Sequence, residues 1–395
     1  MLGGCYMREA LFSLLNENYD EMVRIRRHLH QNPEVSFKED ETAAFIASFY
    51  QQLNIPYRSN IGGNGIVAKL KGAKPGKTVA LRADFDALPI QDEKDVPYRS
   101  KRPGVMHACG HDGHTAMLLT IAKVLQSKQA ELSGNIVFIH QHAEELAPGG
   151  AKPMINDGAL DEVDVIYGTH LWTNTPFGEI HTAPEHLMAA ADRFSITIQG
   201  KGGHGAIPHQ TKDPIVIGAQ LISTLQHIVS RRVDPLDTAV ITVGRFEAGN
   251  TFNVIPHSAT LEGTVRTFDS VLRDRIVEEM ERVTKGITLA GDMKYNFEYF
   301  KGYPPVINHP EHAEHVIQVA QHIPEVEKAL YVQPTMTGED FAYYLQERPG
   351  AFFFTGAALK DNFVPHHHPL FDFDERAMLI GAKALITLTL QALSN

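Results

Sequence analysis

Apolar residues recur at helical spacing in the first part of the chain. From residue 9 to residue 31 they fall on one side of a single predicted helix, which ends before Pro33. Residues 39–53 and 112–125 predict two further helices. Four short apolar runs flanked by turn residues predict buried strands at 65–70, 78–83, 136–140 and 163–169. Strands that alternate with helices in this way predict an α/β fold with a layered sheet.

The pattern changes near residue 190, where apolar and polar residues begin to alternate. The predicted elements are then a strand (193–199), a helix (214–231), two strands (239–246 and 259–266), a helix (271–289) and a strand (294–300). This β-α-β-β-α-β order is the ferredoxin-like plan. After Tyr303-Pro304-Pro305 the helix–strand alternation resumes, and it ends in a helix at 375–393. We therefore predict a discontinuous α/β domain (1–186 and 303–395) that is interrupted by an α+β domain (187–302).

The composition excludes several classes of protein. The chain has 395 residues, of which 43% are hydrophobic and 21% charged, as in an ordinary globular enzyme and unlike a disordered chain or a coiled coil. Lys and Arg total 36 while Asp and Glu total 47, which gives a formal net charge of −11. Because nucleic-acid binding needs a basic surface, we expect no nucleic-acid partner.

The sequence gives no reason to expect a membrane protein. No apolar stretch approaches the ~18 consecutive residues of a membrane span. The N-terminal residues lack the charged start and apolar region that precede a lipoprotein cleavage site, so we interpret Cys5 as incidental and Met7 as a possible native start. Two cysteines cannot build a disulfide framework. We expect a cytoplasmic protein.

Histidine is unusually frequent, with 21 residues, and it is the commonest metal ligand. In the segment MHACGHDGH, residues 106–114, Cys109 and His111 are two positions apart where a loop enters a predicted helix. Thiolate and imidazole together bind Zn and related divalent metals. A single Cys-x-His pair would more often be part of a structural loop whose histidines bind backbone carbonyls, but four potential ligands in six residues favour a metal site.

A second cluster, HQHAEE at residues 140–145, follows a buried strand. Ligand sites of open α/β sheets lie at the carboxyl ends of strands. Because adjacent carboxylates repel each other, Glu144 and Glu145 in a cleft predict a nearby cation. One glutamate would then bind the metal and the other would act as general base. The alternative is a solvated acidic turn, which is more usual for a bare Glu-Glu pair.

Three further segments contain potential ligands or their partners. His170 ends a predicted strand, and His366-His367-His368 lies in a loop before the last helix. Alone, His170 would as readily be a core histidine and the triple histidine a surface feature. Asp84 and Asp86 follow another strand and are candidates to orient metal-bound histidines, or else ordinary loop-initiating residues.

Eight motifs occur in order: RADFDALPI, HACGHDGHTAMLL, QHAEELAPGGA, GTHLW, GKGGHGAIPH, NVIP, GEDFA and HHHPLFDFDE. Together they resemble the M20 metallopeptidase family, and within it the M20D amidohydrolases, which comprise aminoacylases, hippurate hydrolases and auxin-conjugate hydrolases. The resemblance extends from about residue 26 to residue 390. It implies a di-metal exopeptidase-like catalytic domain with an inserted lid and dimerisation domain at 187–302.

The resemblance also implies roles for individual residues. Two divalent ions, Zn or Mn with Co or Ni as alternatives, would be held by Cys109 as the bridging ligand and by His111, Glu145, His170 and His367. Glu144 matches the general base and Asp86 the orienting carboxylate. Asp84 stands where other branches have a metal-binding histidine, so the resemblance does not define its role. His204 matches a histidine that reaches the partner's active site and stabilises the oxyanion, and Asn253 and Arg266 resemble residues that hold the substrate carboxylate.

The implied reaction is hydrolysis of the amide bond of N-acyl-L-amino acids of the N-acetyl or N-benzoyl type, by a homodimer that acts on small molecules. The chain departs from many relatives at His142, where they have proline, and this departure affects the expected pocket shape. Three alternatives remain: an aminopeptidase or dipeptidase for unblocked small peptides, a non-catalytic metal-dependent binding protein, and a redox or zinc-storage protein that uses Cys109. The last is disfavoured because Cys109 has no CxxC partner.

Overall fold

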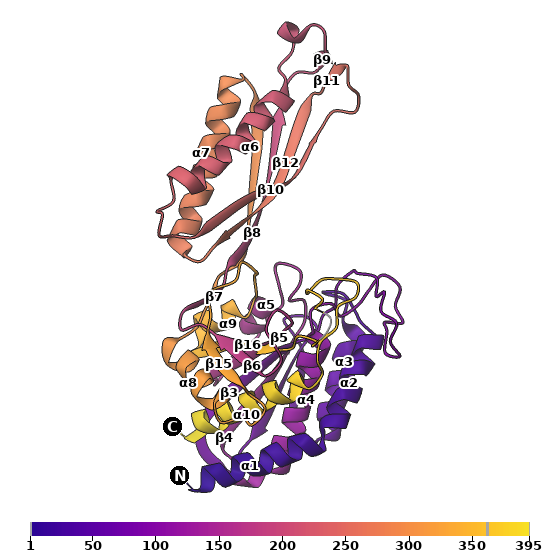
Figure 1. Ribbon diagram of the computed structural model, residues 1–395, viewed down its shortest axis with the longest axis vertical. Coiled ribbons are helices and arrows are strands. Elements are labelled where there is room, and N and C mark those ends of the chain that lie inside the picture. Colours follow the sequence, from indigo (N-terminus) through magenta and orange to yellow (C-terminus); the bar gives the residue numbers. More distant parts are fainter. Residues whose placement is uncertain (1, 361–362, 395) are drawn as a thin grey trace. The chain divides into compact units, whose positions relative to one another are not determined.

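The structure is a computed structural model that describes residues 2–360 and 363–394 (Figure 1). The chain divides into two compact units. Unit 1 comprises Met1–Leu187, Val306–Pro334 and Asp340–Asn395, and unit 2 comprises Met188–Pro305 and Thr335–Glu339. Residues 303–305 and 335–339, which were predicted to lie in the α/β domain, fall in unit 2, and residue 187, predicted to lie in the α+β domain, falls in unit 1.

Unit 1 is built on an eight-stranded sheet, which confirms the predicted α/β class. Its strand order is β1-β2-β4-β3-β5-β16-β6-β15. The strands are β1 (Tyr57–Ile61), β2 (Gly65–Lys71), β3 (Lys74–Asp84), β4 (Ser133–Gln141), β5 (Val165–Trp172), β6 (Glu179–Thr182), β15 (Lys328–Tyr331) and β16 (Gly350–Gly356). The central strands β4, β3, β5 and β16 run parallel to one another, so their carboxyl ends meet at one edge of the sheet.

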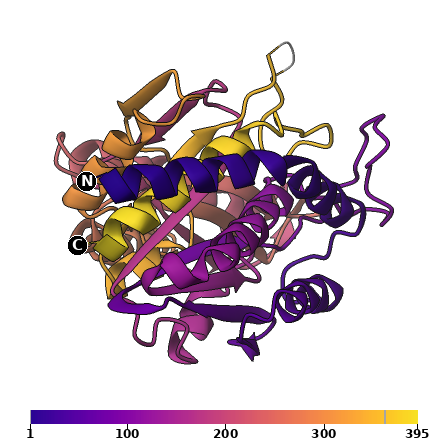
Figure 2. The same ribbon diagram turned by 90° about the horizontal axis from the view of Figure 1, so that it is seen from below.

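Helices of unit 1 share one hydrophobic core with this sheet. The helices are α1 (Leu2–Glu17), α2 (Tyr19–Gln31), α3 (Asp40–Gln52), α4 (His111–Ser127), α5 (Ala151–Asn156), α8 (Pro310–Ala320), α9 (Ala342–Glu347) and α10 (Ala377–Ser394). The core contains residues of α1–α4, α8 and α10 as well as of the strands. The first and last helices, α1 and α10, lie side by side although they are at opposite ends of the chain (Figure 2). By length and composition α10 is apolar enough to cross a membrane, but most of it is buried in this core, as is usual for a core helix.

The single helix predicted for residues 9–31 is wrong, because the structure has two helices that meet at Asn18. The Asn18 side chain donates a hydrogen bond to the Leu14 carbonyl (2.8 Å), which is the competition with the backbone that makes asparagine a poor helix-interior residue. Buried residues lie on both sides of the break, for example Leu15 in α1 and Met22 in α2. The apolar period therefore continues through Asn18, although the helix does not.

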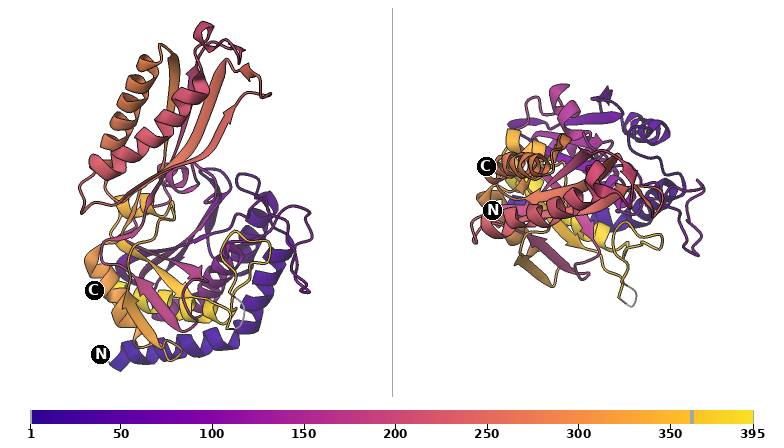
Figure 3. Two further views of the ribbon diagram at one scale, coloured as in Figure 1. Left: turned by 45° about the horizontal axis from the view of Figure 1, so that its top comes forward. Right: turned by 90° about the horizontal axis from the view of Figure 1, so that it is seen from above.

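Unit 2 contains a four-stranded antiparallel sheet with the order β10-β12-β8-β13. Its elements are β8 (Ala190–Gln199), α6 (Pro214–Arg231), β10 (Ala239–Ala248), β12 (Ser258–Thr267), α7 (Ser270–Ala290) and β13 (Lys294–Tyr303), in the predicted β-α-β-β-α-β order. Helices α6 and α7 pack side by side on this sheet (Figure 3), and they form a separate core with residues such as Phe194, Leu221 and Ile276. Asp213 and Asp269 cap the two helices by accepting backbone N–H groups.

Short elements complete the chain. They are β7 (His186–Met188), β9 (Gly203–His204), β11 (Val254–Ile255), β14 (Val306–Ile307) and the 3₁₀ turns Gln129–Glu131 and Pro208–Gln210. Strands β9 and β11 pair antiparallel as a small ribbon in unit 2, with His204 opposite Val254.

Candidate metal centre

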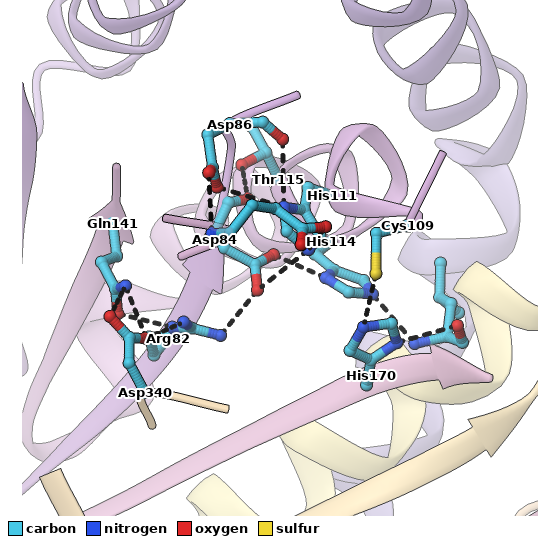
Figure 4. A network of polar contacts seen from close by, with 12 residues as sticks. Arg82, Asp84, Asp86, Cys109, His111, His114, Thr115, Gln141, His170 and Asp340 are labelled. Carbon is cyan, nitrogen blue, oxygen red and sulfur yellow. Dashed lines mark hydrogen bonds and ion pairs between the residues drawn. The ribbon is translucent and has the colours of Figure 1, made fainter. Parts of the chain in front are cut away.

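Titratable side chains gather where the parallel strands of unit 1 end (Figure 4). Strand β3 ends at Asp84, β4 ends at Gln141, and His170 lies near the end of β5. Helix α4 begins at His111, directly after the turn that contains Cys109. The carboxyl-end edge of the sheet therefore brings together residues from distant parts of the chain, as expected for a ligand site of an open α/β sheet.

His111 presents one ring nitrogen to a carboxylate partner and the other to the centre of the cluster. Its Nδ1 lies 3.0 Å from the Asp86 carbonyl oxygen and 3.2 Å from Asp86 Oδ1. Its Nε2 is buried without a hydrogen-bond partner among the described residues, 3.8 Å from Glu145 Oε1. Burial lowers the pKa of His111, but Asp84, Asp86 and Glu145 outweigh burial and raise this pKa to about 10. The site is thus electrostatically suited to a cation at this position.

Cys109 and His170 form the second part of the cluster. The distance from Cys109 Sγ to His170 Nε2 is 3.4 Å, and His170 Nδ1 donates to the Leu171 carbonyl (2.9 Å), which leaves Nε2 directed at the sulfur. Burial, followed by Glu145 and Glu144, raises the pKa of the Cys109 thiol well above its usual value. Because a metal ligand must be a thiolate, a bound cation would have to replace this proton.

Glu144, Glu145 and His367 complete the cluster. His367 Nε2 lies 3.2 Å from Glu145 Oε1, and the His367 N–H donates to the Ala108 carbonyl (2.8 Å). The donor atoms of Cys109, Glu145 and His367 lie within 4.8 Å of one another, and the same holds for Cys109, His111 and His170 and for His111, Glu144 and Glu145. Two of these groups share the Cys109 sulfur. Sulfur, imidazole and carboxylate donors around buried, unpartnered atoms fit divalent metal ions of the zinc type.

The three consecutive histidines at 366–368 have different surroundings. His367 faces Glu145, whereas His366 accepts the Thr173 N–H at Nε2 (3.1 Å) and lies with Nδ1 3.8 Å from Cys109 Sγ. Burial lowers the pKa of His366 to about 3, so its ring is neutral. His368 is exposed and accepts the Leu370 N–H. The geometry of the described residues therefore separates three histidines that the sequence could not distinguish.

Asp84 and His114 form a buried pair that the sequence analysis did not identify. His114 Nδ1 lies 2.6 Å from Asp84 Oδ1, and His114 Nε2 accepts the Leu171 N–H (2.9 Å). Asp84 Oδ2 accepts from Arg82 (2.7 Å), which also donates to Asp340 Oδ1 (2.9 Å). Both ring nitrogens of His114 thus have partners within the protein, whereas Asp84 Oδ2 also lies 3.7 Å from His111 Nε2, at the edge of the candidate metal centre. In the sequence, the two-residue period of a strand indicates only that Arg82 and Asp84 lie on one face of β3.

The remaining candidates, His204, Asn253 and Arg266, lie in unit 2. His204 is exposed on β9 and accepts the Ala206 N–H at Nδ1 (3.0 Å). Asn253 precedes β11 in the same ribbon, and its carbonyl accepts the Gly205 N–H (2.9 Å). Arg266 is half-buried near the carboxyl end of β12, whereas the ribbon adjoins the amino end of that strand. The Arg266 Nε–H donates to the Met336 carbonyl (3.1 Å). Within this unit the fold brings His204 and Asn253 together but not Arg266.

Residues 80–391 match the peptidase family M20/M25/M40. The protein YhaA of Bacillus subtilis (strain 168) is 58% identical over 381 residues, which cover 96% of either chain. An N-acyl-L-amino acid amidohydrolase of Geobacillus stearothermophilus is 50% identical over 304 residues, 77% of this chain and 82% of that enzyme. The crystal structure of the YXEP protein of Bacillus subtilis, described as a dinuclear metal binding peptidase from the M20 family, superposes with a TM-score of 0.83 at 35% identity and covers 96% of this chain and 99% of its own.

Proposed function

The chain belongs to peptidase family M20/M25/M40 and is a metal-dependent hydrolase, and we propose that it hydrolyses the amide bond of N-acyl-L-amino acids, of the N-acetyl or N-benzoyl type. The observation that carries this proposal is the pair of donor groups sharing Cys109, with Glu144 beside them at the edge of the sheet. A relative that is half identical over most of its length bears the name N-acyl-L-amino acid amidohydrolase, which supports the acylated substrate class.

We infer that two divalent ions bind to these groups, with Cys109 shared and with His111, His170, Glu145 and His367 as the other ligands. We propose Zn or Mn, with Co or Ni as the alternatives, because the thiolate and imidazole donors favour Zn and the carboxylates suit Mn. When bound, such ions lower the pKa of a water molecule towards ~7 and polarise the substrate carbonyl. The contact between Asp86 and His111 Nδ1 directs Nε2 to the ions, which is the usual arrangement of a metal-binding histidine.

Glu144 acts as the general base in this proposal. Its carboxylate takes a proton from the attacking water and returns it to the leaving amine, a role typically worth ~10²–10⁴ in rate. His204 stabilises the charge that develops on the carbonyl oxygen, a kind of contact whose loss typically costs ~10²–10³. Arg266 holds the substrate carboxylate, for which the planar guanidinium of arginine is well shaped, and Asn253 joins it from the partner's copy of the ribbon, because one chain keeps the two residues apart.

We propose further that the protein is a cytoplasmic homodimer assembled through unit 2. The ribbon of that unit that contains His204 also has Phe252 fully exposed and Val254 49% exposed, so apolar side chains are uncovered beside the residue that would reach the partner. A partner's copy of the ribbon would then bring a second His204 within reach of substrate. A reduced Cys109, which the proposed centre requires, is the normal state of a thiol in the cytoplasm.

The test is a substrate panel measured by amine release. Protein loaded separately with Mn and with Zn is given N-acetyl and N-benzoyl amino acids and, in parallel, unblocked dipeptides. We expect cleavage of the acylated compounds. Cleavage of unblocked dipeptides alone would identify a dipeptidase instead, and binding of two metal ions without any turnover would identify a metal-dependent binding protein.

A further inference from the structure

The backbone on either side of Glu144 is held by two buried carboxylates. The Ala143 N–H donates to Glu39 Oε1 (2.9 Å), and the Glu145 N–H donates to Asp86 Oδ2 (3.0 Å). Glu39 and Asp86 come from separate segments, one before α3 and the other after β3. The peptide unit that precedes Ala143 and the one that follows Glu144 are therefore both fixed to groups outside their own loop.

Ala143 has a backbone conformation that needs such support. Its φ is 52°, in the left-handed region where a residue with a Cβ is strained, and its side chain is buried. Strain of this kind persists only where the surroundings over-determine the conformation, typically at functional sites. The direction in which the chain leaves Ala143 sets where the Glu144 side chain begins.

Glu39 connects this strained residue to two other parts of unit 1. Its Oε1 also accepts the Phe37 N–H (2.9 Å), and its Oε2 accepts the Asn64 side-chain amide (3.1 Å). The side chain is completely buried. Burial, followed by the charge of Asp86, raises the pKa of Glu39 to about 7. In either protonation state an oxygen remains to accept the Ala143 N–H, so the contact with the loop does not require a full negative charge.

We propose that Glu39 is a positioning residue of the hydrolytic reaction, which holds Ala143 in its strained conformation and thereby directs the Glu144 carboxylate into the metal centre. This proposal rests on the function proposed above for Glu144. In the part of the chain that the structure describes, the hydrogen bonds of the Glu39 side chain go to Phe37, Asn64 and Ala143 and to none of the candidate metal ligands. Its effect on the reaction is transmitted by one backbone hydrogen bond.

The experiment compares E39A and E39Q with two matched variants of Glu34. Glu34 is also a buried glutamate beside α3, but its carboxylate accepts the Thr42 and Glu41 N–H groups and does not touch the loop around Glu144. For each variant we would measure kcat and KM for an N-acyl amino acid, bound metal, and hydrogen–deuterium exchange of residues 142–145. The exchange measurement reports on the loop whether or not the protein turns over that substrate.

We expect E39A to lower kcat by about 10²-fold, as a misplacement of about 1 Å does, with two metal ions still bound and KM changed by less than about threefold. Exchange of residues 142–145 should become faster. E39Q should keep most of the kcat and most of the protection of residues 142–145 from exchange, because its amide oxygen can accept the Ala143 N–H. E34A and E34Q should lower the melting temperature and leave kcat close to that of the unmodified protein.

If E34A lowers kcat as much as E39A does, the proposal is overturned, because the loss would then be a general effect of removing a buried carboxylate from this part of unit 1. Unchanged exchange of residues 142–145 in E39A would also overturn it. If the unmodified protein cleaves no acylated substrate, the proposed function is contradicted. The contact between Glu39 and the loop is then still tested by exchange, and faster exchange of residues 142–145 in E39A would support it.

Discussion

At the residue scale, the protonation of Cys109 sets how metal binding depends on pH. Burial and the neighbouring glutamates raise the pKa of the thiol, and His111 has a pKa of about 10, so both carry a proton at neutral pH when no cation is bound. A metal ion binds their deprotonated forms and displaces these protons. We therefore expect affinity for Zn to rise with pH between about 6 and 8.

Calorimetric titration in buffers of different ionisation enthalpy measures this proton release directly. We expect one to two protons to leave for each pair of ions bound, and fewer to leave in C109A, which has no thiol to deprotonate. Zn affinity that does not change with pH, with no proton released, would show that neither residue is a ligand.

The residue types of the candidate site could be predicted from the sequence, but their partners could not. Cys109 and His111 could be identified because ligand types are dense in one short segment, and the structure places them beside His170 and Glu145. The bond between His114 and Asp84 and the contact between Glu39 and Ala143 could not be predicted, because each joins positions far apart in the chain. No local period or spacing encodes such a contact.

At the element scale, Arg26 joins α2 to two segments that contain candidate ligands. Its guanidinium is fully buried and pairs with Asp112 in the first turn of α4 (2.8 Å) and with Asp372 (2.8 Å) and Glu375 (3.1 Å) in the segment after His367. Replacement by an apolar side chain leaves three carboxylates without this partner. We expect R26M to lower the free energy of unfolding by about 3–5 kcal/mol.

The neighbouring Arg27 provides the control for this prediction. It also pairs with Glu375 (2.6 Å), but its side chain is 46% exposed, and exposed ion pairs contribute at most about 1 kcal/mol. Denaturant unfolding of R26M and R27M, followed by circular dichroism, separates the two cases. Equal losses of stability in both variants would contradict the role of the buried arginine.

Most elements could be predicted from the sequence because their apolar periods are clear. Helix α6 was predicted with the bounds it has, and the order of elements in unit 2 was correct. The break at Asn18 was missed because the buried face continues from α1 into α2. Residues 335–339 were placed in the wrong unit because Thr335 pairs with Met188, which is distant in the chain.

At the scale of the whole molecule, unit 2 has the features of an independent domain. It contains a ferredoxin-like sheet and its own core of buried residues from β8, α6 and α7. We expect a fragment of residues 188–305 to fold by itself, with a cooperative thermal transition and dispersed amide signals in an NMR spectrum. A fragment without tertiary structure would show that unit 2 depends on the rest of the chain for its stability.

In the proposed reaction Glu144 acts as the base beside a pair of metal ions, and turnover by E144Q, measured together with its metal content, isolates this role. The variant keeps the size of the side chain and removes its ability to take a proton. We predict that E144Q binds two ions per chain, as the unmodified protein does, and that its kcat for an N-acyl amino acid is lower by about 10²–10⁴-fold. We also predict that removing the metal from the unmodified protein abolishes turnover. Full activity of metal-loaded E144Q would show that Glu144 is not the base, and undiminished activity after metal removal would show that hydrolysis does not need the metal ions.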